Sequence, residues 1–123
     1  MKGKIVLFGA SGRLGKELVK LYDFITPTRK EIDITEFDKV SSYLKRIRPS
    51  TVIHAAASVG AKECEEDKET AYKTNVVGTY NVAKACQKNN IKLVYLSTDT
   101  IFDGEKGNYK EDDIPNPINY YSL

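Results

Sequence analysis

Three glycines near the N-terminus have the spacing of a phosphate-binding loop. The first directly follows an apolar run at residues 4–8, and the other two lie at the start of residues 12–22, where leucines recur at helical spacing. Gly9 permits a tight turn, Gly12 a close approach by a pyrophosphate, and Gly15 close packing of helix on strand. The helix N-terminus adds unpaired N–H groups and a positive dipole end. We therefore predict that a dinucleotide binds this loop, rather than that it is a ligand-free turn; the loop reads Gly9-Ala10-Ser11-Gly12-Arg13-Leu14-Gly15.

The next chemical signal lies about 20 residues beyond the first glycine. Dinucleotide folds commonly carry Asp or Glu there to hold the ribose hydroxyls, but this chain has Thr28-Arg29-Lys30. The guanidinium of Arg29 matches a 2′-phosphate in a bidentate manner, and Arg13 can assist it. We therefore predict NADP(H) in preference to NAD(H). The alternative is that Arg29 and Lys30 are solvated loop charges.

The elements that position these residues alternate between short apolar runs and helical patterns. Strands are predicted at residues 4–8, 24–28, 51–55 and 91–96, and helices at 12–22, 37–47 and 65–89. This alternation favours the α/β class, with a Rossmann-type, doubly wound parallel sheet. We expect the strand order 3-2-1-4, which leaves residues 91–96 as an unpaired edge strand that promotes self-association.

Composition limits the classes of partner. A chain of 123 residues allows one domain, against about 150 residues for a typical one. A net charge of +2 is too balanced for a nucleic-acid or anionic-membrane binder, and no apolar run is long enough for a membrane helix. Cys64 and Cys86 lie far apart in the sequence, and Met1-Lys2-Gly3-Lys4 does not resemble a signal peptide. These features favour a reducing cytoplasm.

Several other polar residues have plain interpretations. His54 lies at an apolar strand end and is expected to pack or hydrogen-bond rather than to act as a base. The acidic residues after Glu63 read as a solvated helix start. Residues 100–123 are rich in turns and form an expected loop-rich active-site segment. Their carboxylates lack metal-ligand spacing, so no metal site is predicted.

A set of ordered motifs resembles the extended short-chain dehydrogenase/reductases and, within them, the dTDP-4-dehydrorhamnose reductase family. The resemblance covers the glycine loop and essentially the whole chain. Its further motifs are Thr28-Arg29, Glu31-Ile32-Asp33-Ile34-Thr35, Val52-Ile53-His54-Ala55-Ala56-Ala57, Asn75-Val76-Val77-Gly78-Thr79-Tyr80-Asn81, Leu96-Ser97-Thr98-Asp99, Phe102-Asp103-Gly104 and Pro115-Asn116-Pro117-Ile118-Asn119. The activity that it implies is NAD(P)H-dependent reduction of the 4-keto group of a dTDP-deoxysugar, in dTDP-rhamnose biosynthesis.

The resemblance also implies roles for single residues. Thr98 hydrogen-bonds the substrate carbonyl and Tyr121 is the catalytic tyrosine, with the adjacent Tyr120 as the competing candidate. A hydroxyl can stabilise the negative charge that hydride transfer leaves on oxygen, and a phenol can protonate it. The remaining implied positions are Asp33 and Ile34 at the adenine, Ala55, Ala56 and Ala57 along the cofactor, Asn75 supporting the active site, and Asp99 at the substrate.

Two departures from the family pattern matter. The family places a lysine four residues after its tyrosine, and counted from Tyr121 this position lies beyond Leu123. Thr100 stands where the family favours an aromatic residue. We therefore interpret residues 1–123 as the N-terminal portion of an NADP(H)-binding Rossmann domain, without the C-terminal strands and the substrate domain. On its own this chain is expected to be inactive.

Two other functions fit the same resemblance. One is a non-catalytic NADP-binding regulatory subunit, like the β subunit of methionine adenosyltransferase. The other is a related sugar-nucleotide epimerase or dehydratase. For the reductase the expected partner is a dTDP-sugar substrate, and a homo-oligomer is expected for the intact protein. The 123-residue chain by itself is expected to self-associate through its edge strand.

Overall fold

A computed structural model describes residues 3–123. Its first half contains β1 (Ile5–Phe8), α1 (Arg13–Leu21), α2 (Phe37–Ile47) and β2 (Thr51–His54). Then follow α3 (Ala61–Glu66), α4 (Lys68–Tyr72), the π-helix η1 (Lys73–Gly78), α5 (Thr79–Lys88), β3 (Lys92–Tyr95) and the 3₁₀ turn η2 (Asp99–Ile101). The predicted α/β class is confirmed, since β1, β2 and β3 form one parallel sheet.

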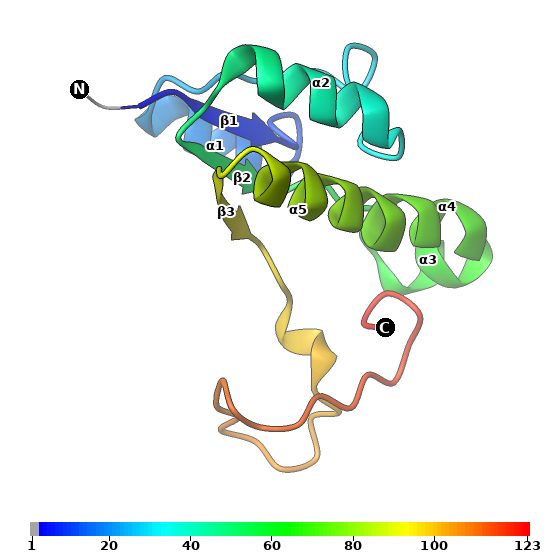
Figure 1. Cartoon of the computed structure of the whole chain (residues 1–123). Coiled ribbons are helices and arrows are strands. Elements are labelled where there is room, and N and C mark those ends of the chain that lie inside the picture. The colour runs from blue at the N-terminus through cyan, green and yellow to red at the C-terminus, as the bar shows by residue number, and fades with distance from the viewer. Residues whose placement is uncertain (1–2) are drawn as a thin grey trace.

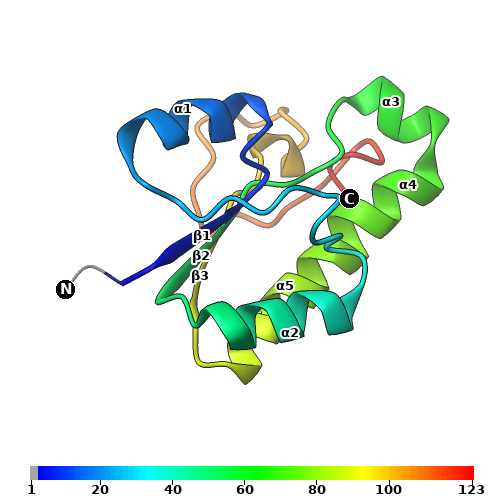
Figure 2. The same cartoon turned by 90° about the horizontal axis from the view of Figure 1, so that it is seen from above.

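Helices cover both faces of the sheet (Figure 2). Helix α1 lies on one face, while α2 and α5 lie side by side on the other. The buried core fills the space between the sheet and the α2–α5 layer, because β1 and β2 turn apolar residues toward helical residues of matching spacing. Its fully buried members include Val6, Val40, Leu44, Val52 and Val82.

The predicted strand order is wrong. β1 pairs with β2, and β2 pairs with β3, whereas residues 24–28 contribute a single bridge between Ile25 and Val6 on the other side of β1. In the numbering of the predicted strands the order is 2-1-3-4. In a right-handed crossover, the face of the sheet that the connecting helix covers decides on which side of the first strand the next strand lies. Helices on opposite faces therefore place the next strand on opposite sides. Since α1 and α2 lie on opposite faces, the chain returns past β1 and continues outward.

The predicted helix at residues 65–89 is one continuous run in the sequence but four elements in the structure. It begins earlier, at Ala61, and is interrupted at Asp67, whose carboxylate accepts a hydrogen bond from the Thr70 amide at 3.0 Å and caps α4. The expected end is confirmed, since Asn89 caps α5 and Asn90 adopts a positive φ of 54°. After the interruption, η1 lies beside the loop that follows β2, where Asn75 bonds to Ser58.

The last strand and the segment after it lie at the open side of the sheet (Figure 1). β3 is bonded on one edge to β2, and Val94 and Tyr95 are exposed. Residues 99–123 then run away from the sheet, and the chain returns to end beside α3. No helix within residues 3–123 is long and apolar enough to cross a membrane.

Candidate cofactor and active site

The glycine loop lies at the carboxyl ends of β1 and β2, where the strand order reverses direction. Gly9 has a φ of +91°, and a β-carbon on it would lie 2.5 Å from the carbonyl carbon of Ala55 and the nitrogen of Ala56. The Gly12 amide donates to the Gly9 carbonyl at 3.1 Å and closes the turn. The crevice outside such a reversal point is where open α/β sheets bind ligands.

The start of α1 is built to approach an anion. Gly12 is its N-cap residue and no side chain caps the helix, so the N–H groups of the first turn keep their bonding capacity. Gly15 is buried, and a β-carbon on it would overlap the Gly9 carbonyl oxygen, so only glycine lets the helix pack this closely. Ser11, Arg13 and Leu14 are exposed at the rim. Helix N-termini of this kind can bind phosphate groups, and the binding of a pyrophosphate here stays a prediction.

A π-helical residue holds the loop that follows β2. The amide of Asn75, in η1, donates to the Ser58 carbonyl at 2.9 Å and accepts from the Ser58 backbone N–H at 2.7 Å. Ala55 and Ala56 are partly buried and Ala57 is exposed immediately before this point. The small side chains expected along the cofactor therefore lie on a fixed loop next to Gly9. π-Helical turns are frequent at functional sites.

The segment after Ile25 carries the residues expected at the adenosine end. Arg29 Nε lies 3.7 Å from Asp33 Oδ2, and its side chain is largely exposed. Asp33 accepts from the Thr35 backbone N–H at 2.9 Å and the Thr35 hydroxyl at 2.8 Å, and these bonds hold the pKa of the Asp33 carboxyl below its usual value. Arg29 is thus tethered beside a carboxylate with its guanidinium accessible.

The two other residues of this segment are used structurally. Ile34 is 8 % exposed and packs against Gly78 of η1, so its side chain belongs to the core rather than to an open surface. Glu31 accepts from the Thr28 backbone N–H at 2.7 Å and from its hydroxyl at 2.9 Å. These bonds give the turn after Ile25 a defined shape. Sequence reasoning did not single out Glu31, although its spacing from Thr28 is that of a capping box.

Thr98 and Asp99 lie between β3 and the loop-rich segment. The Thr98 hydroxyl accepts from the Thr100 backbone N–H at 3.2 Å and shares a hydrogen bond with the Thr100 hydroxyl at 2.9 Å. It thereby caps η2. Thr100, noted in the sequence as a departure, is the residue that orients the Thr98 hydroxyl.

The two adjacent tyrosines differ in their surroundings. The Tyr120 backbone N–H donates to Glu65 Oε1 at 2.8 Å, and Lys68 Nζ lies 5.4 Å from the centroid of its ring. Tyr121 follows in a turn in which Asn119 Oδ1 accepts from the backbone N–H and the hydroxyl of Ser122. Tyr120 is therefore attached to the α3–α4 region, and Tyr121 is partly exposed.

His54 ends β2 but does not face an open site. It is 1 % exposed, its Nε2 lies 3.0 Å from the Thr79 hydroxyl oxygen, and its ring stacks on Tyr95 at 5.7 Å between centroids. Burial lowers the pKa of His54 to about 4. The expected packing and hydrogen-bonding role is confirmed. Within residues 3–123 no three His, Cys, Asp or Glu side chains gather in a group that could hold a metal ion.

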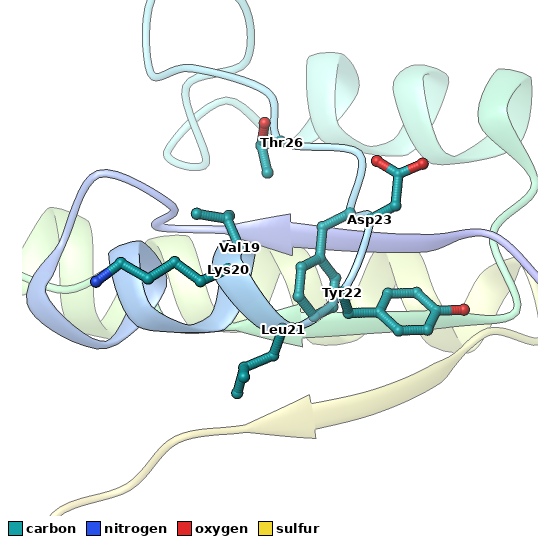
Figure 3. Close-up of a pocket in the computed structure, with 7 residues that line it drawn as sticks. Val19, Lys20, Leu21, Tyr22, Asp23 and Thr26 are labelled. Atoms are coloured by element: carbon teal, nitrogen blue, oxygen red, sulfur yellow. The ribbon is translucent and has the colours of Figure 1, made fainter.

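A hollow at the other end of α1 lies away from these residues (Figure 3). It is an open groove of about 450 Å³ at the C-terminal end of α1, lined by Val19, Lys20, Leu21, Tyr22, Asp23, Phe24 and Thr26. The glycine loop is at the opposite end of the same helix. This groove is therefore separate from the candidate site.

Comparison with known proteins gives consistent relatives. The family model described as the RmlD substrate binding domain matches residues 2–123. A dTDP-4-dehydrorhamnose reductase of Aggregatibacter actinomycetemcomitans is 36 % identical in an alignment 125 positions long, which covers 96 % of this chain and 42 % of that protein. A methionine adenosyltransferase 2 subunit beta of Xenopus tropicalis is 29 % identical, over 96 % of this chain and 39 % of that protein.

A solved structure extends the similarity to three dimensions. The crystal structure of dTDP-4-dehydrorhamnose reductase from Bacillus anthracis in complex with NADP superimposes with a TM-score of 0.91 at 38 % identity. The match covers 99 % of this chain and 46 % of that one. The chain thus spans less than half the length of the relatives that it matches.

Proposed function

The chain belongs to the RmlD substrate binding domain family, and from that membership we propose that the intact protein reduces the 4-keto group of a dTDP-deoxysugar with NAD(P)H, as in dTDP-rhamnose biosynthesis. The observation that carries the proposal is the close approach of Gly9 to the Ala55–Ala56 backbone. This approach places the glycine turn and the loop after β2 side by side at the carboxyl ends of the two strands. The reductases of Aggregatibacter and Bacillus anthracis, at 36 % and 38 % identity, support the choice of reaction.

Residues 1–123 supply the NADP(H)-binding portion in this proposal. The first turn of α1 binds the pyrophosphate, and Ala55, Ala56 and Ala57 leave room along the loop after β2. Asp33 and the backbone of Ile34 flank the adenine, while the Ile34 side chain stays in the core. Arg29 pairs with the 2′-phosphate, which favours NADP(H) over NAD(H). The bound dinucleotide supplies the hydride. The NADP complex of the Bacillus anthracis relative supports the class of cofactor.

Thr98 and Tyr121 are the proposed catalytic pair, in the segment of residues 100–123 and the strand end before it. The Thr98 hydroxyl donates to the substrate oxygen as negative charge develops there, and the Tyr121 phenol gives it a proton. Asp99 lies on the substrate side. The family resemblance assigns the proton transfer to Tyr121, and Tyr120, held through its backbone by Glu65 and with Lys68 over its ring, is the competing candidate. A tyrosine with a reference pKa of about 10 needs a neighbouring cation to work near neutrality.

A second candidate is a non-catalytic regulatory subunit. The β subunits of methionine adenosyltransferase 2 match 96 % of this chain, and the Xenopus tropicalis protein is 29 % identical. That function needs the cofactor cradle but not the Thr98–Tyr121 chemistry. Copurification with a synthetase would favour it.

The deciding experiment is a turnover assay of the intact protein. NADPH or NADH is mixed with a dTDP-4-keto-6-deoxysugar, and loss of the reduced nicotinamide is followed at 340 nm. The reductase proposal expects turnover with both cofactors and a higher kcat/KM with NADPH. NADPH binding without turnover would exclude the reductase proposal and favour the regulatory function.

We also propose that the protein is a cytoplasmic homo-oligomer. Cys64 and Cys86 are free and buried, as in a reducing compartment. In residues 3–123 taken alone, the exposed edge of β3, with Val94 and Tyr95 at its surface, is a site for self-association. Light scattering tests the oligomer, and a monodisperse monomer would count against it.

A further inference from the structure

The loop from Phe102 to Asn116 is closed at its base. The Asn116 backbone N–H donates to the Ile101 carbonyl at 2.9 Å, so the two ends of the loop meet. Directly inside this closure the rings of Phe102 and Tyr109 stack, with centroids 4.5 Å apart and planes 8° from parallel. A long loop of this kind in a compact domain is commonly functional.

One carboxylate joins the distant parts of this loop. Asp103 Oδ1 accepts hydrogen bonds from the Tyr109 hydroxyl and from the Glu105 backbone N–H, the latter at 3.0 Å. Asp103 Oδ2 accepts from Asn116 Nδ2 at 2.9 Å. These donors, led by the Tyr109 hydroxyl, lower the pKa of Asp103 to about 2. The carboxylate is therefore charged throughout the physiological range.

A second set of contacts makes the loop a folded unit. The Lys106 backbone N–H donates to the Tyr109 hydroxyl at 3.0 Å, and Lys106 Nζ pairs with Asp113 Oδ1 at 2.7 Å. Asp113 Oδ2 accepts from the Lys110 backbone N–H at 2.7 Å. The Tyr109 hydroxyl thus accepts one hydrogen bond from the Lys106 backbone N–H and donates another to Asp103. The network connects the start, middle and end of the loop.

The position of this unit in the chain gives it a functional meaning. It is preceded by Thr98 and η2, and it is followed, after Asn116, by the turn that holds Tyr121. The contacts at Ile101, Asp103 and Asn116 therefore set the path by which the chain passes from one proposed catalytic residue to the other. A small error in the relative placement of reacting groups has large effects on rate.

We infer that Asp103 is a positioning residue, which fixes the 102–116 loop and with it the placement of Tyr121 relative to Thr98. The inference rests on the proposed reductase function. Asp103 acts through its three donors and has no direct contact with substrate or cofactor in this role. Within residues 3–123 Asp103 belongs to no group of three His, Cys, Asp or Glu side chains that could hold a metal ion.

The test is a polarity swap between Asp103 and Asn116 in the intact protein. In D103N the new amide oxygen can still accept from Tyr109 and Glu105, but the charge-assisted hydrogen bond with Asn116 is lost and is replaced at best by a neutral one with the Asn116 amide turned over. N116D places two carboxylates together. In the D103N/N116D double variant an amide again faces a carboxylate, with the direction of the hydrogen bond reversed. D112N, at an exposed position of the same loop, is the matched control.

The measured quantities are kcat, KM, the Kd of NADPH and the hydrogen exchange of the Glu105 and Asn116 amides. We expect kcat to fall about tenfold or more in D103N and N116D, with the NADPH Kd within about twofold of wild type. The double variant should regain kcat to within about threefold, and D112N should match wild type. Exchange at both amides should speed up in the single variants and slow again in the double variant.

Each contrary result overturns the inference. A positioning role is excluded if D103N keeps the wild-type kcat, or if its NADPH affinity falls by the same factor as its kcat. It is also excluded if the kcat of the double variant is no higher than that of either single variant. If wild-type protein shows no turnover, the proposed function fails. In that case, hydrogen exchange at the Glu105 and Asn116 amides that is unchanged in D103N overturns the inference as well. Faster exchange in D103N that slows again in the double variant supports the loop-fixing role of Asp103.

Discussion

The side chain of Asn75 makes two hydrogen bonds with the main chain of Ser58. Its Nδ2 donates to the Ser58 carbonyl at 2.9 Å, and its Oδ1 accepts from the Ser58 backbone N–H at 2.7 Å. The two residues are 17 positions apart, in the π-helix η1 and the loop after β2. This pair fixes the loop on which Ala55, Ala56 and Ala57 approach the glycine turn.

Substitution of Asn75 by Ala is expected to loosen that loop and weaken cofactor binding. The Ser58 amide loses its partner and the Ser58 carbonyl keeps only the weak donor Cys64 Sγ at 3.5 Å, which costs about 1–3 kcal/mol of unfolding free energy where the amide stays buried. We expect the NADPH Kd to rise about tenfold, measured by nicotinamide fluorescence. Gln87→Ala, at an exposed position of α5, is the control. A variant that keeps wild-type affinity would show that Asn75 does not shape the cofactor site.

The glycine turn allows a matched pair of variants. Gly9 and Gly104 both have positive φ angles, +91° and +82°, but only a β-carbon on Gly9 meets backbone, whereas nothing lies within 4 Å of one on Gly104. Gly104→Ala should cost about 1–2 kcal/mol from the left-handed conformation alone. Gly9→Ala should cost about 1–3 kcal/mol more from the clash and should abolish NADPH binding. Equal losses of stability in urea unfolding would refute the steric contribution.

The sequence predicted the local features of the site better than its long-range features. The glycine loop, β1, β2 and the face of α2 follow from local spacing, and they are found as expected. Strand order could not be read in the same way, because buried parallel strands share one pattern and their order depends on which face each helix covers. The interruption at Asp67 and the contacts of Asp103 with Tyr109 and Asn116 depend on tertiary packing, which a single sequence does not display.

The free energy of unfolding should decrease as pH is lowered, because of His54. Its pKa is lowered by burial to about 4, below the 6.5 of an exposed histidine. The unfolded chain therefore binds more protons between these values, and stability is fully present above pH 6.5 and is lost as pH decreases. From pH 7.5 to pH 5 the loss attributable to His54 is about 2 kcal/mol. Urea unfolding of wild type and His54→Gln at these pH values gives the free energy of unfolding of each protein against pH. The contribution of His54 is the difference between the two pH dependences, and parallel pH dependences would contradict the prediction.

Arg29 should discriminate between the two nicotinamide cofactors. Its guanidinium is exposed and 3.7 Å from Asp33, so it can turn to a 2′-phosphate without breaking a buried contact. Arg29→Ala is expected to raise the Kd of NADPH about tenfold or more and to leave that of NADH within about twofold. Lys30→Ala, at the adjacent exposed position, is the control for loss of one positive charge. If both variants weaken NADPH equally, the interaction is general electrostatic attraction and Arg29 has no specific role.

The two C-terminal tyrosines can be separated by removing one hydroxyl at a time. The Tyr120 backbone N–H is bonded to Glu65, and its ring lies under Lys68; neither contact uses its hydroxyl, so Tyr120→Phe should keep both. We expect kcat of Tyr120→Phe to stay within about threefold of wild type. Tyr121→Phe removes the proposed proton donor and should lower kcat by a factor of about 100 to 10,000, the usual contribution of general acid catalysis, with the NADPH Kd unchanged. Steady-state kinetics and cofactor titration of the intact protein measure both effects. The reverse pattern would assign the proton transfer to Tyr120 and would mean that its link to α3 positions the catalytic residue itself.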